Sequence, residues 1–195
     1  HKGPEVLIRA TSELVKHSPL LRHKLIVNVV GGASGANTEE VDRLKELSSW
    51  LGIDDVVRFA PPVPRADLPQ WYRAADLVIV PSYSESFGLV ALEASASGVP
   101  VVATGVGGLL NLIEHGRTGY LVPARDPNQF ASFTARLLND PLLALSMGTA
   151  AAERAKSYSW KAAAAKASRA KNRVIGINRH CAGRARSSQR LRWPA

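Results

Sequence analysis

The sequence predicts an α/β protein with a Rossmann-like parallel sheet and helices on both faces. Two observations predict this fold. Short apolar runs rich in Val and Ile alternate along the chain with stretches whose apolar residues recur at helical spacing. The connections between these segments are short, as in the repeated strand–helix units that build parallel sheets. Ligands of such sheets bind beyond the carboxyl ends of the strands, so a site is expected there.

Short apolar runs predict the strands. The first run, Leu-Ile-Val-Asn-Val-Val, is apolar at almost every position and predicts a buried strand. A later run, Leu-Val-Ile-Val, ends at a proline and leads into the most informative segment of the chain. The strands are expected at residues 25–30, 56–59, 77–80, 101–103 and 119–122.

Several residues mark where the predicted helices begin. Pro4 suits the first position of the first helix. Asn37 begins a capping-box pattern before the second helix, and Asp67 can cap the third. Asp126 or Asn128 begins a later helix that runs to about residue 138.

The apolar residues of the predicted helices recur with the helical period. Trp50, Trp71 and Trp160 fall on helical faces, so all three are expected in the core. The helices are expected at residues 5–16, 37–51, 67–74, 88–97, 109–114, 126–138, 142–156 and 160–171.

The positive charge of the chain is concentrated at one end. A formal net charge of +9 favours acidic partners, nucleic acid among them. However, residues 172–195 hold six arginines and no acidic residue, which leaves +3 for residues 1–171. We therefore expect one domain at 1–171, for which nucleic acid is an unlikely partner. Residues 172–195 are expected to be a basic tail, either disordered or foreign to the native end of the domain.

The bulk composition favours a cytoplasmic location. No apolar run approaches the roughly 20 residues that span a bilayer, so no membrane span is expected. The single cysteine, Cys181, excludes an internal disulfide framework and fits a reducing compartment. No secretory signal is visible at the first residues.

Two glutamates carry the strongest functional signal. They bound residues 85–93, Glu-Ser-Phe-Gly-Leu-Val-Ala-Leu-Glu. If a helix begins near Gly88, its first turn offers unpaired backbone N–H groups to an anion. Glu85 then lies in the loop before the helix, and Glu93 lies about a turn and a half inside it. Such a site holds a phosphate on amides while two carboxylates accept hydrogen bonds from hydroxyls, a combination that sugar nucleotides present.

Several further segments match a known pattern. Tyr-Arg-Ala-Ala-Asp at 72–76, residues 81–94, Ala-Ser-Gly-Val-Pro-Val-Val-Ala at 96–103 and residues 107–122 resemble retaining GT-B glycosyltransferases. These are the glycosyl transferases of group 1, or family 4, of the sucrose-synthase and mannosyltransferase type. The Gly-Ala-Ser-Gly-Ala-Asn loop and the Tyr-Ser-Trp near residue 160 are most similar to the D-inositol-3-phosphate glycosyltransferases of mycothiol biosynthesis. The resemblance covers roughly residues 1–171.

The resemblance implies the C-terminal, donor-binding half of a GT-B enzyme, truncated at its N-terminus. The arginine of the family's Gly-Arg-Leu-x-x-x-Lys-Gly element would lie before residue 1, and the N-terminal acceptor domain would be missing. The fragment alone is therefore expected to be inactive. The implied reaction moves N-acetylglucosamine from its UDP-linked donor to 1D-myo-inositol 3-phosphate by front-face substitution. A homodimer is compatible with the resemblance.

The resemblance also implies roles for matching residues. Glu85 would be catalytic because it would contact the donor sugar and the reacting centre, whereas Glu93 would accept bonds from the ribose hydroxyls. Lys2 would neutralise phosphate charge, and backbone groups at Val63 would read uracil. The implied donor-binding set is Lys2, Val63, Glu85, Ser86, Phe87, Gly88, Leu89, Val90 and Glu93.

A second glycine-rich loop follows the strand expected at 101–103. Gly105, Gly107 and Gly108 form either a loop that closes over the donor or an ordinary turn.

No catalytic metal and no cofactor are expected. The histidines lack metal-ligand spacing, and in this family helix amides and basic residues stabilise the leaving diphosphate instead. The resemblance implies at most a structural cation such as Mg²⁺ on the backbone oxygens of Tyr72, Arg73, Ala75 and Val99.

Two alternatives remain open at this point. The donor motif is shared within the family, so the substrates could be those of a mannosyl-, glucosyl- or sucrose-phosphate-synthase-like enzyme. The alternative from another class is a basic nucleic-acid-binding module, which rests on the arginine tail.

Overall fold

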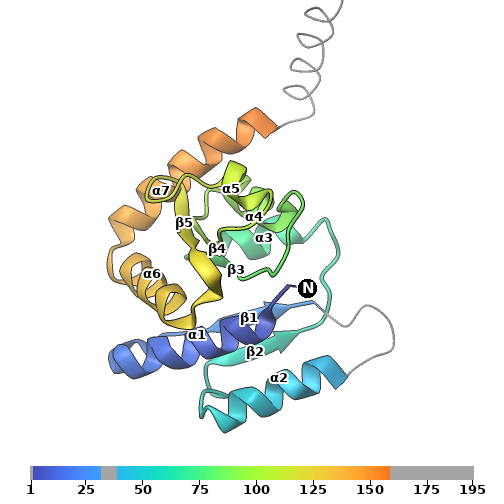
Figure 1. Ribbon diagram of the computed structural model, residues 1–195, viewed down its shortest axis with the longest axis vertical. Helices are drawn as coiled ribbons and strands as arrows, with labels where there is room; N and C mark the ends of the chain where they lie inside the picture. Colours follow the sequence, from blue (N-terminus) through green and yellow to red (C-terminus); the bar gives the residue numbers. More distant parts are fainter. Residues whose placement is uncertain (1, 32–38, 159–195) are drawn as a thin grey trace, which may run out of the picture. The chain divides into compact units, whose positions relative to one another are not determined.

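The computed structural model describes residues 2–31 and 39–158, and its elements as far as α7 belong to one compact unit (Figure 1). The strands are β1 (Val27–Val30), β2 (Val57–Ala60), β3 (Val78–Val80), β4 (Val101–Thr104) and β5 (Gly119–Val122). The α-helices are α1 (Pro4–His17), α2 (Glu39–Trp50), α3 (Leu68–Arg73), α4 (Leu89–Ala96), α5 (Leu109–Leu112), α6 (Pro127–Asn139) and α7 (Pro141–Ala155). The 3₁₀ turns are η1 (Pro19–Leu21), η2 (Pro123–Arg125) and η3 (Lys156–Tyr158). The helix expected at 160–171 and the tail at 172–195 lie outside the described residues.

All strand pairs are parallel, as the sequence predicts. β1 pairs with β2, with Val29 opposite Phe59. A second sheet has the order β3-β4-β5, with Val102 opposite Tyr120. Among the described residues no backbone hydrogen bond joins β1 to β3, so the strands form two sheets where the sequence predicts one.

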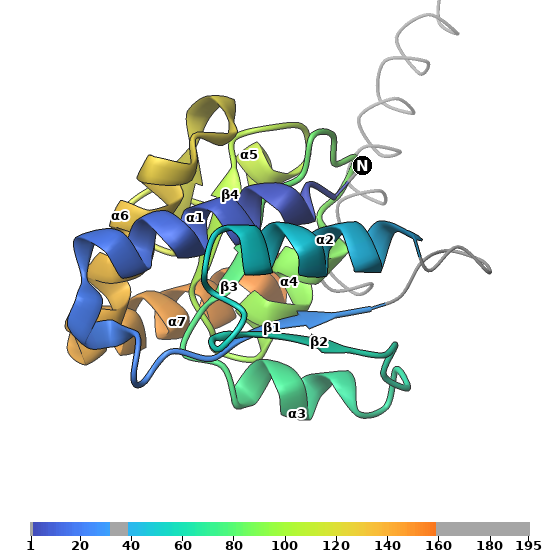
Figure 2. The same ribbon diagram turned by 90° about the horizontal axis from the view of Figure 1, so that it is seen from below.

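Helices cover both faces of the strands (Figures 1 and 2). α1 contacts α2 and α6, whereas α4 contacts α3, α5 and α7. In Figure 2, α1 and α2 lie on one side of β1 and β2, and α3 lies on the other. The predicted Rossmann-like class is therefore confirmed. Within the described segments, no helix combines the length and apolarity that crossing a bilayer requires.

Helix α1 contributes to the hydrophobic core of both sheets. Its Val6 packs in one cluster with Val102, Val122 and Phe130, which come from β4, β5 and α6. Its Ile8 packs in another cluster, which is built from α2, β2 and the turn between them. The two clusters are therefore joined through opposite sides of one helix.

β1 is less buried than its apolar sequence predicts. Its residues alternate between half-buried and exposed, and Val30 is 37% exposed. Every residue of β4, by contrast, is at most 1% exposed. The difference follows from the pairing, because β1 has a partner on only one edge whereas β4 lies between two strands.

The predicted helix starts are partly confirmed. Pro4 occupies the first position of α1, and the Asp126 carboxylate accepts a hydrogen bond from the Asn128 N–H at the start of α6 (2.9 Å). The prediction for Asp67 is wrong, since its side chain makes no capping bond to α3. Its backbone is already helical, with φ −93° and ψ −18°, whereas a capping residue needs an extended conformation. Asn37 lies outside the described residues.

Two of the three tryptophans expected in the core lie at the surface, and Trp160 lies outside the described residues. Trp50 is 77% exposed and Trp71 is 39% exposed. Helical spacing shows which residues share a face, but it does not show whether a neighbouring element covers that face. Their placement in the core was therefore a wrong prediction.

We expect Phe130→Ala to lower the free energy of unfolding by about 3–5 kcal/mol, because lost transfer energy and a new cavity both contribute. Phe130 is 0% exposed at the centre of its cluster. Urea unfolding followed by circular dichroism measures the change. Leu142→Ala is the control, since Leu142 is 79% exposed. Equal losses in the two variants would contradict the assigned core.

Candidate functional site

The start of α4 lies where a ligand site is expected, after the carboxyl end of β3. Gly88 precedes the helix with a left-handed backbone (φ 89°, ψ 48°) that favours glycine. The first helical bond runs from the Leu92 N–H to the Gly88 carbonyl (2.9 Å). The N–H groups of Leu89, Val90 and Ala91 therefore precede the first intrahelical bond and form the positive end of the helix dipole.

Glu85 holds the turn just before that helix. Its Oε1 accepts a hydrogen bond from the Gly88 N–H (3.2 Å), and its Oε2 pairs with Lys2 Nζ (2.7 Å). The Glu85 side chain is only 13% exposed. The pKa of Glu85 lies below its ordinary value, mainly because Lys2 donates to it, and despite the opposing effect of burial. Backbone N–H groups of Gly88 and Phe87 lower this pKa further, so Glu85 is ionised at neutral pH.

Two glycines after β4 pack closely against the Glu85 turn. The Gly108 N–H donates to the Glu85 carbonyl (2.8 Å). A Cβ on Gly107 would lie 2.0 Å from that carbonyl oxygen, and a Cβ on Gly108 would lie 2.6 Å from Phe87 Cα. Side chains at these positions would therefore displace the turn. The described backbone shows a packed turn at these glycines, and closure of the loop over a donor stays a prediction.

The first residues of α1 reach the same turn. Gly3 has a left-handed backbone (φ 65°), and a Cβ there would lie 2.3 Å from the Pro81 carbonyl oxygen. Pro81 follows β3 directly, so the chain enters α1 beside the carboxyl end of that strand. This close approach brings the preceding residue, Lys2, to Glu85.

A polar group that sequence reasoning missed lies beside this entry point. The Tyr83 hydroxyl donates to Glu5 Oε1 (2.6 Å), and the Arg125 guanidinium lies 4.2 Å above the Tyr83 ring. The hydrogen bond to Glu5 raises the pKa of Tyr83. Ala124 and Arg125 both have left-handed backbones, at φ 54° and 57°. The loops after β4 and β5 thus both contact the loop after β3 that holds Tyr83 and Glu85, and only the tertiary fold brings these residues together.

Glu93 is held from a neighbouring helix. It lies one helical turn after Leu89 in α4, and its Oε2 accepts a hydrogen bond from the Tyr72 hydroxyl of α3 (2.9 Å). Burial, followed by the bond to Glu93, raises the pKa of Tyr72. Tyr72 therefore stays protonated and donates, which fixes the orientation of one carboxylate oxygen. Sequence reasoning missed this role of the Tyr72 side chain.

The other predicted donor-binding residues surround the start of α4 or precede α3. Phe87, Leu89 and Val90 are 46%, 58% and 38% exposed. Ser86 is also exposed, and Val63 is half-buried in the loop between β2 and α3.

The predicted cation position involves backbone oxygens at two helix ends. Tyr72, Arg73 and Ala75 lie at or just after the end of α3, and Val99 lies after α4. The Tyr72 carbonyl already accepts a hydrogen bond from the Ala75 N–H (3.0 Å). Within the described residues no group of three or more His, Cys, Asp or Glu could hold a metal ion. The structural cation stays a prediction.

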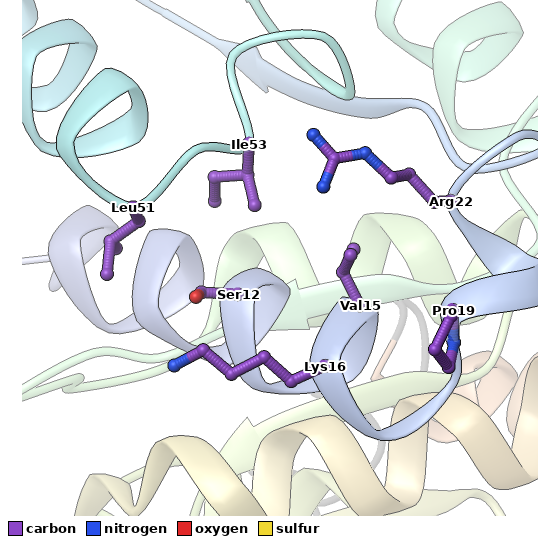
Figure 3. A pocket seen from close by; sticks show the side chains of 7 residues that line it. All are labelled: Ser12, Val15, Lys16, Pro19, Arg22, Leu51 and Ile53. Carbon is purple, nitrogen blue, oxygen red and sulfur yellow. The ribbon is translucent and has the colours of Figure 1, made fainter.

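A cavity lies elsewhere, between α1, η1 and the turn after α2 (Figure 3). It borders the segments that lead into the amino ends of β1 and β2, whereas Glu85 follows the carboxyl end of β3. Its lining includes none of the predicted site residues and consists of Ser12, Val15, Lys16, Pro19, Arg22, Leu51 and Ile53. The candidate site is therefore separate from this cavity.

Comparison with known proteins identifies the sequence family. The family model described as glycosyl transferases group 1 matches residues 1–154. The chain is 51% identical over 164 residues to D-inositol 3-phosphate glycosyltransferase 2 of Catenulispora acidiphila. This alignment covers 84% of the chain and 38% of that protein. It is 49% identical over 160 residues to D-inositol 3-phosphate glycosyltransferase of Kribbella flavida, in an alignment that covers 82% of the chain and 38% of that protein.

Solved structures show the same fold. Sucrose-phosphate synthase from Thermosynechococcus elongatus superimposes with a TM-score of 0.75 at 32% identity, over 90% of this chain and 43% of that one. HepE from Anabaena, solved in complex with UDP and glucose, superimposes with a TM-score of 0.70 at 30% identity, over 80% of this chain and 40% of that one. The chain thus spans less than half the length of these relatives. The match over residues 1–154 shows that the chain belongs to the glycosyl transferases group 1 family.

Proposed function

We propose that this chain is the donor-binding domain of a retaining glycosyltransferase and binds the diphosphate of a UDP-sugar at the start of α4. One observation carries the proposal. An open first helical turn lies beside an ionised Glu85 and the Lys2 cation, at the carboxyl ends of parallel strands. Helix amides and a nearby cation favour a bound anion, and such strand ends are where this class of fold binds ligands.

The diphosphate would bind the amides of Leu89 and Val90. Gly88 lacks a side chain and has the left-handed backbone that opens this approach. Lys2 would supply a positive charge, because its side chain is 68% exposed and can turn from Glu85 towards a phosphate. The structure shows Lys2 paired with Glu85, so the donor phosphate and Glu85 would share this cation.

The ribose hydroxyls would donate to Glu93. Its Oε2 already accepts from Tyr72, which leaves Oε1 as the oxygen for a ribose hydroxyl. Val63, in the loop before α3, would meet the uracil through its backbone. Together these positions extend the proposed donor site from the start of α4 towards α3.

Glu85 would act at the sugar. It is ionised and held by Gly88 and Lys2, so it can accept a bond from a sugar hydroxyl while the Phe87 and Gly88 backbone contacts the same ring. In the proposed front-face substitution, the acceptor oxygen bonds to the anomeric carbon as the bond to the diphosphate breaks. The departing diphosphate takes the proton of the acceptor hydroxyl, and the amides of α4 stabilise its charge.

The proposed reaction transfers N-acetylglucosamine from UDP-N-acetylglucosamine to 1D-myo-inositol 3-phosphate, as a step of mycothiol biosynthesis. The names of relatives about half identical to this chain support this choice. The alternative within the family is another hexosyl donor or acceptor, which the likeness to a sucrose-phosphate synthase supports. A second, acceptor-binding domain would complete the enzyme, and the present chain alone would be inactive. Assays of the full-length enzyme with UDP- and GDP-linked sugars separate these alternatives.

We expect Glu85→Gln in the full-length enzyme to lower kcat by about 100-fold or more, the scale of losing a group that stabilises the transition state. Glutamine keeps the size of the side chain but loses its charge. Steady-state kinetics measure the effect, and circular dichroism checks that the fold is kept. An unchanged kcat would remove the catalytic role from Glu85.

Lys2→Met is expected to raise the pKa of Glu85 towards the ordinary value of 4.5, because Lys2 is the main cause of the lowered pKa. In the native chain the Lys2–Glu85 ion pair stabilises the fold at pH values above the ordinary pKa of Glu85. This contribution is lost as the pH falls through the lowered pKa. Carbon NMR of the Glu85 carboxyl group against pH measures the shift. Lys16→Met, which breaks the ion pair with Glu13, is the control and should leave Glu85 unchanged.

Tyr72→Phe is expected to weaken UDP binding by roughly 2- to 10-fold, because a typical hydrogen bond contributes about 0.5–1.5 kcal/mol. Without the Tyr72 hydroxyl, Glu93 loses the hydrogen bond that orients it. Calorimetric titration measures the affinity. The difference between native chain and variant should disappear for 2′,3′-dideoxyuridine diphosphate, which lacks the ribose hydroxyls. If the loss is the same for both ligands, Tyr72 does not act through Glu93 on the ribose.

A further inference from the structure

Two side chains at the start of α1 reach the loop between β3 and α4. Lys2 Nζ pairs with Glu85 Oε2 (2.7 Å), and Glu5 Oε1 accepts a hydrogen bond from the Tyr83 hydroxyl (2.6 Å). Lys2 and Glu5 are close in the chain, and so are Tyr83 and Glu85. The two contacts therefore join the same two segments side by side, and a shift of the start of α1 would alter both.

The backbone between the two contacts is closely packed. Gly3 is buried, and a Cβ there would lie 2.3 Å from the Pro81 carbonyl oxygen and 3.2 Å from Tyr83 Cε2. The Tyr83 ring thus packs against the residue that follows Lys2, while its hydroxyl reaches Glu5 in the first turn of α1. One side chain contacts the start of α1 at two points.

The Tyr83 ring is itself held from a third segment. The Arg125 guanidinium, from the turn after β5, lies 4.2 Å above the ring in a cation–π contact. The hydrogen bond to Glu5 raises the pKa of Tyr83, so the hydroxyl stays protonated and donates over the whole range in which Glu85 titrates. Tyr83 is 43% exposed, so a substitution there opens no cavity in the core.

Lys2 needs a support of this kind. Its side chain is 68% exposed, and exposed ion pairs are weak because ordering two long side chains costs conformational entropy. Lys2 is nevertheless the main cause of the lowered pKa of Glu85. A fixed backbone at the start of α1 lowers the entropy that is lost when Lys2 pairs, as preorganisation does in any binding event.

We propose that Tyr83 is a positioning residue of the donor site: by holding Glu5 it fixes the start of α1 and so places Lys2 beside Glu85. Tyr83 acts through these two residues and not by contact with the donor. The effect on a donor phosphate rests on the proposed function, whereas the effect on the Lys2–Glu85 pair does not.

The test is Tyr83→Phe, which keeps the ring beneath Arg125, removes the hydroxyl and changes no charge. We expect the pKa of Glu85 to rise towards 4.5, because Lys2 is held less firmly. Carbon NMR of the Glu85 carboxyl group measures it, and circular dichroism checks the fold. Lys2→Met/Tyr83→Phe should give the same pKa as Lys2→Met alone, since Tyr83 acts through Lys2. An unchanged pKa in Tyr83→Phe, or a further rise in the double variant, would overturn the proposal.

Variants of Glu5 separate positioning from a direct effect of charge. Loss of a nearby negative charge by itself would lower the pKa of Glu85, so a rise in Glu5→Ala supports positioning and a fall contradicts it. Glu5→Gln keeps an acceptor for the Tyr83 hydroxyl and should cause no rise. The control is Glu13→Ala on the same helix, which breaks the ion pair with Lys16 and should leave Glu85 unchanged.

A double variant tests whether Glu5 instead competes for Lys2. Once released by Tyr83→Phe, an ionised Glu5 could draw Lys2 away from Glu85. Tyr83→Phe/Glu5→Gln removes that competing charge. A raised pKa of Glu85 in this variant supports the anchoring role of Tyr83, and a return to the native pKa would overturn it.

Calorimetric titration with UDP tests the consequence for the donor site. We expect Tyr83→Phe to weaken UDP binding by roughly 2- to 5-fold, the scale of an exposed ion pair, and to cause no further loss beside Lys2→Met. If the native chain binds UDP and Tyr83→Phe binds it equally well, Tyr83 has no role at the donor site. If the native chain does not bind UDP, the proposed function fails, while the pKa of Glu85 still decides whether Tyr83 positions Lys2.

Discussion

The turn from Glu85 to Gly88 is the constraint on which the candidate site depends. Its carboxylate, backbone and following glycine are each held by a different part of the chain. Lys2 pairs with the carboxylate, Gly108 donates to the Glu85 carbonyl, and Gly88 takes a left-handed backbone before α4. Because Gly107 and Gly108 touch the turn without a Cβ, even a methyl group there would move it. The direction of the first amides of α4 follows from this one turn.

Charge at the site follows from the same packing. Glu85 is largely buried, which by itself disfavours its ionised form, yet Lys2 and two backbone N–H groups lower its pKa. Tyr72 donates to Glu93 because burial keeps its own hydroxyl protonated. Both carboxylates are thus fixed by donors from outside α4. Preorganised groups of this kind cost little reorganisation when a ligand arrives.

Helix α1 connects the site to the rest of the fold. The residues at its start lie beside the Glu85 turn. Apolar side chains along the helix pack in the hydrophobic clusters of both sheets. The two sheets consequently share a helix but no strand hydrogen bonds within the described residues.

The sequence by itself determined the strand–helix alternation, the cap at Asp126 and the helix start after Gly88, because these depend on residues close together in the chain. It also located Glu85 and Glu93 through a recognisable motif. Only the tertiary structure decided that Tyr83 meets Glu5, that Gly107 touches Glu85 and that Trp50 lies at the surface. The pairing of β1 was likewise not predictable from its apolar run. Periodicity reports which side chains share a face, whereas contacts between distant segments and the cover over each face arise only when the elements pack.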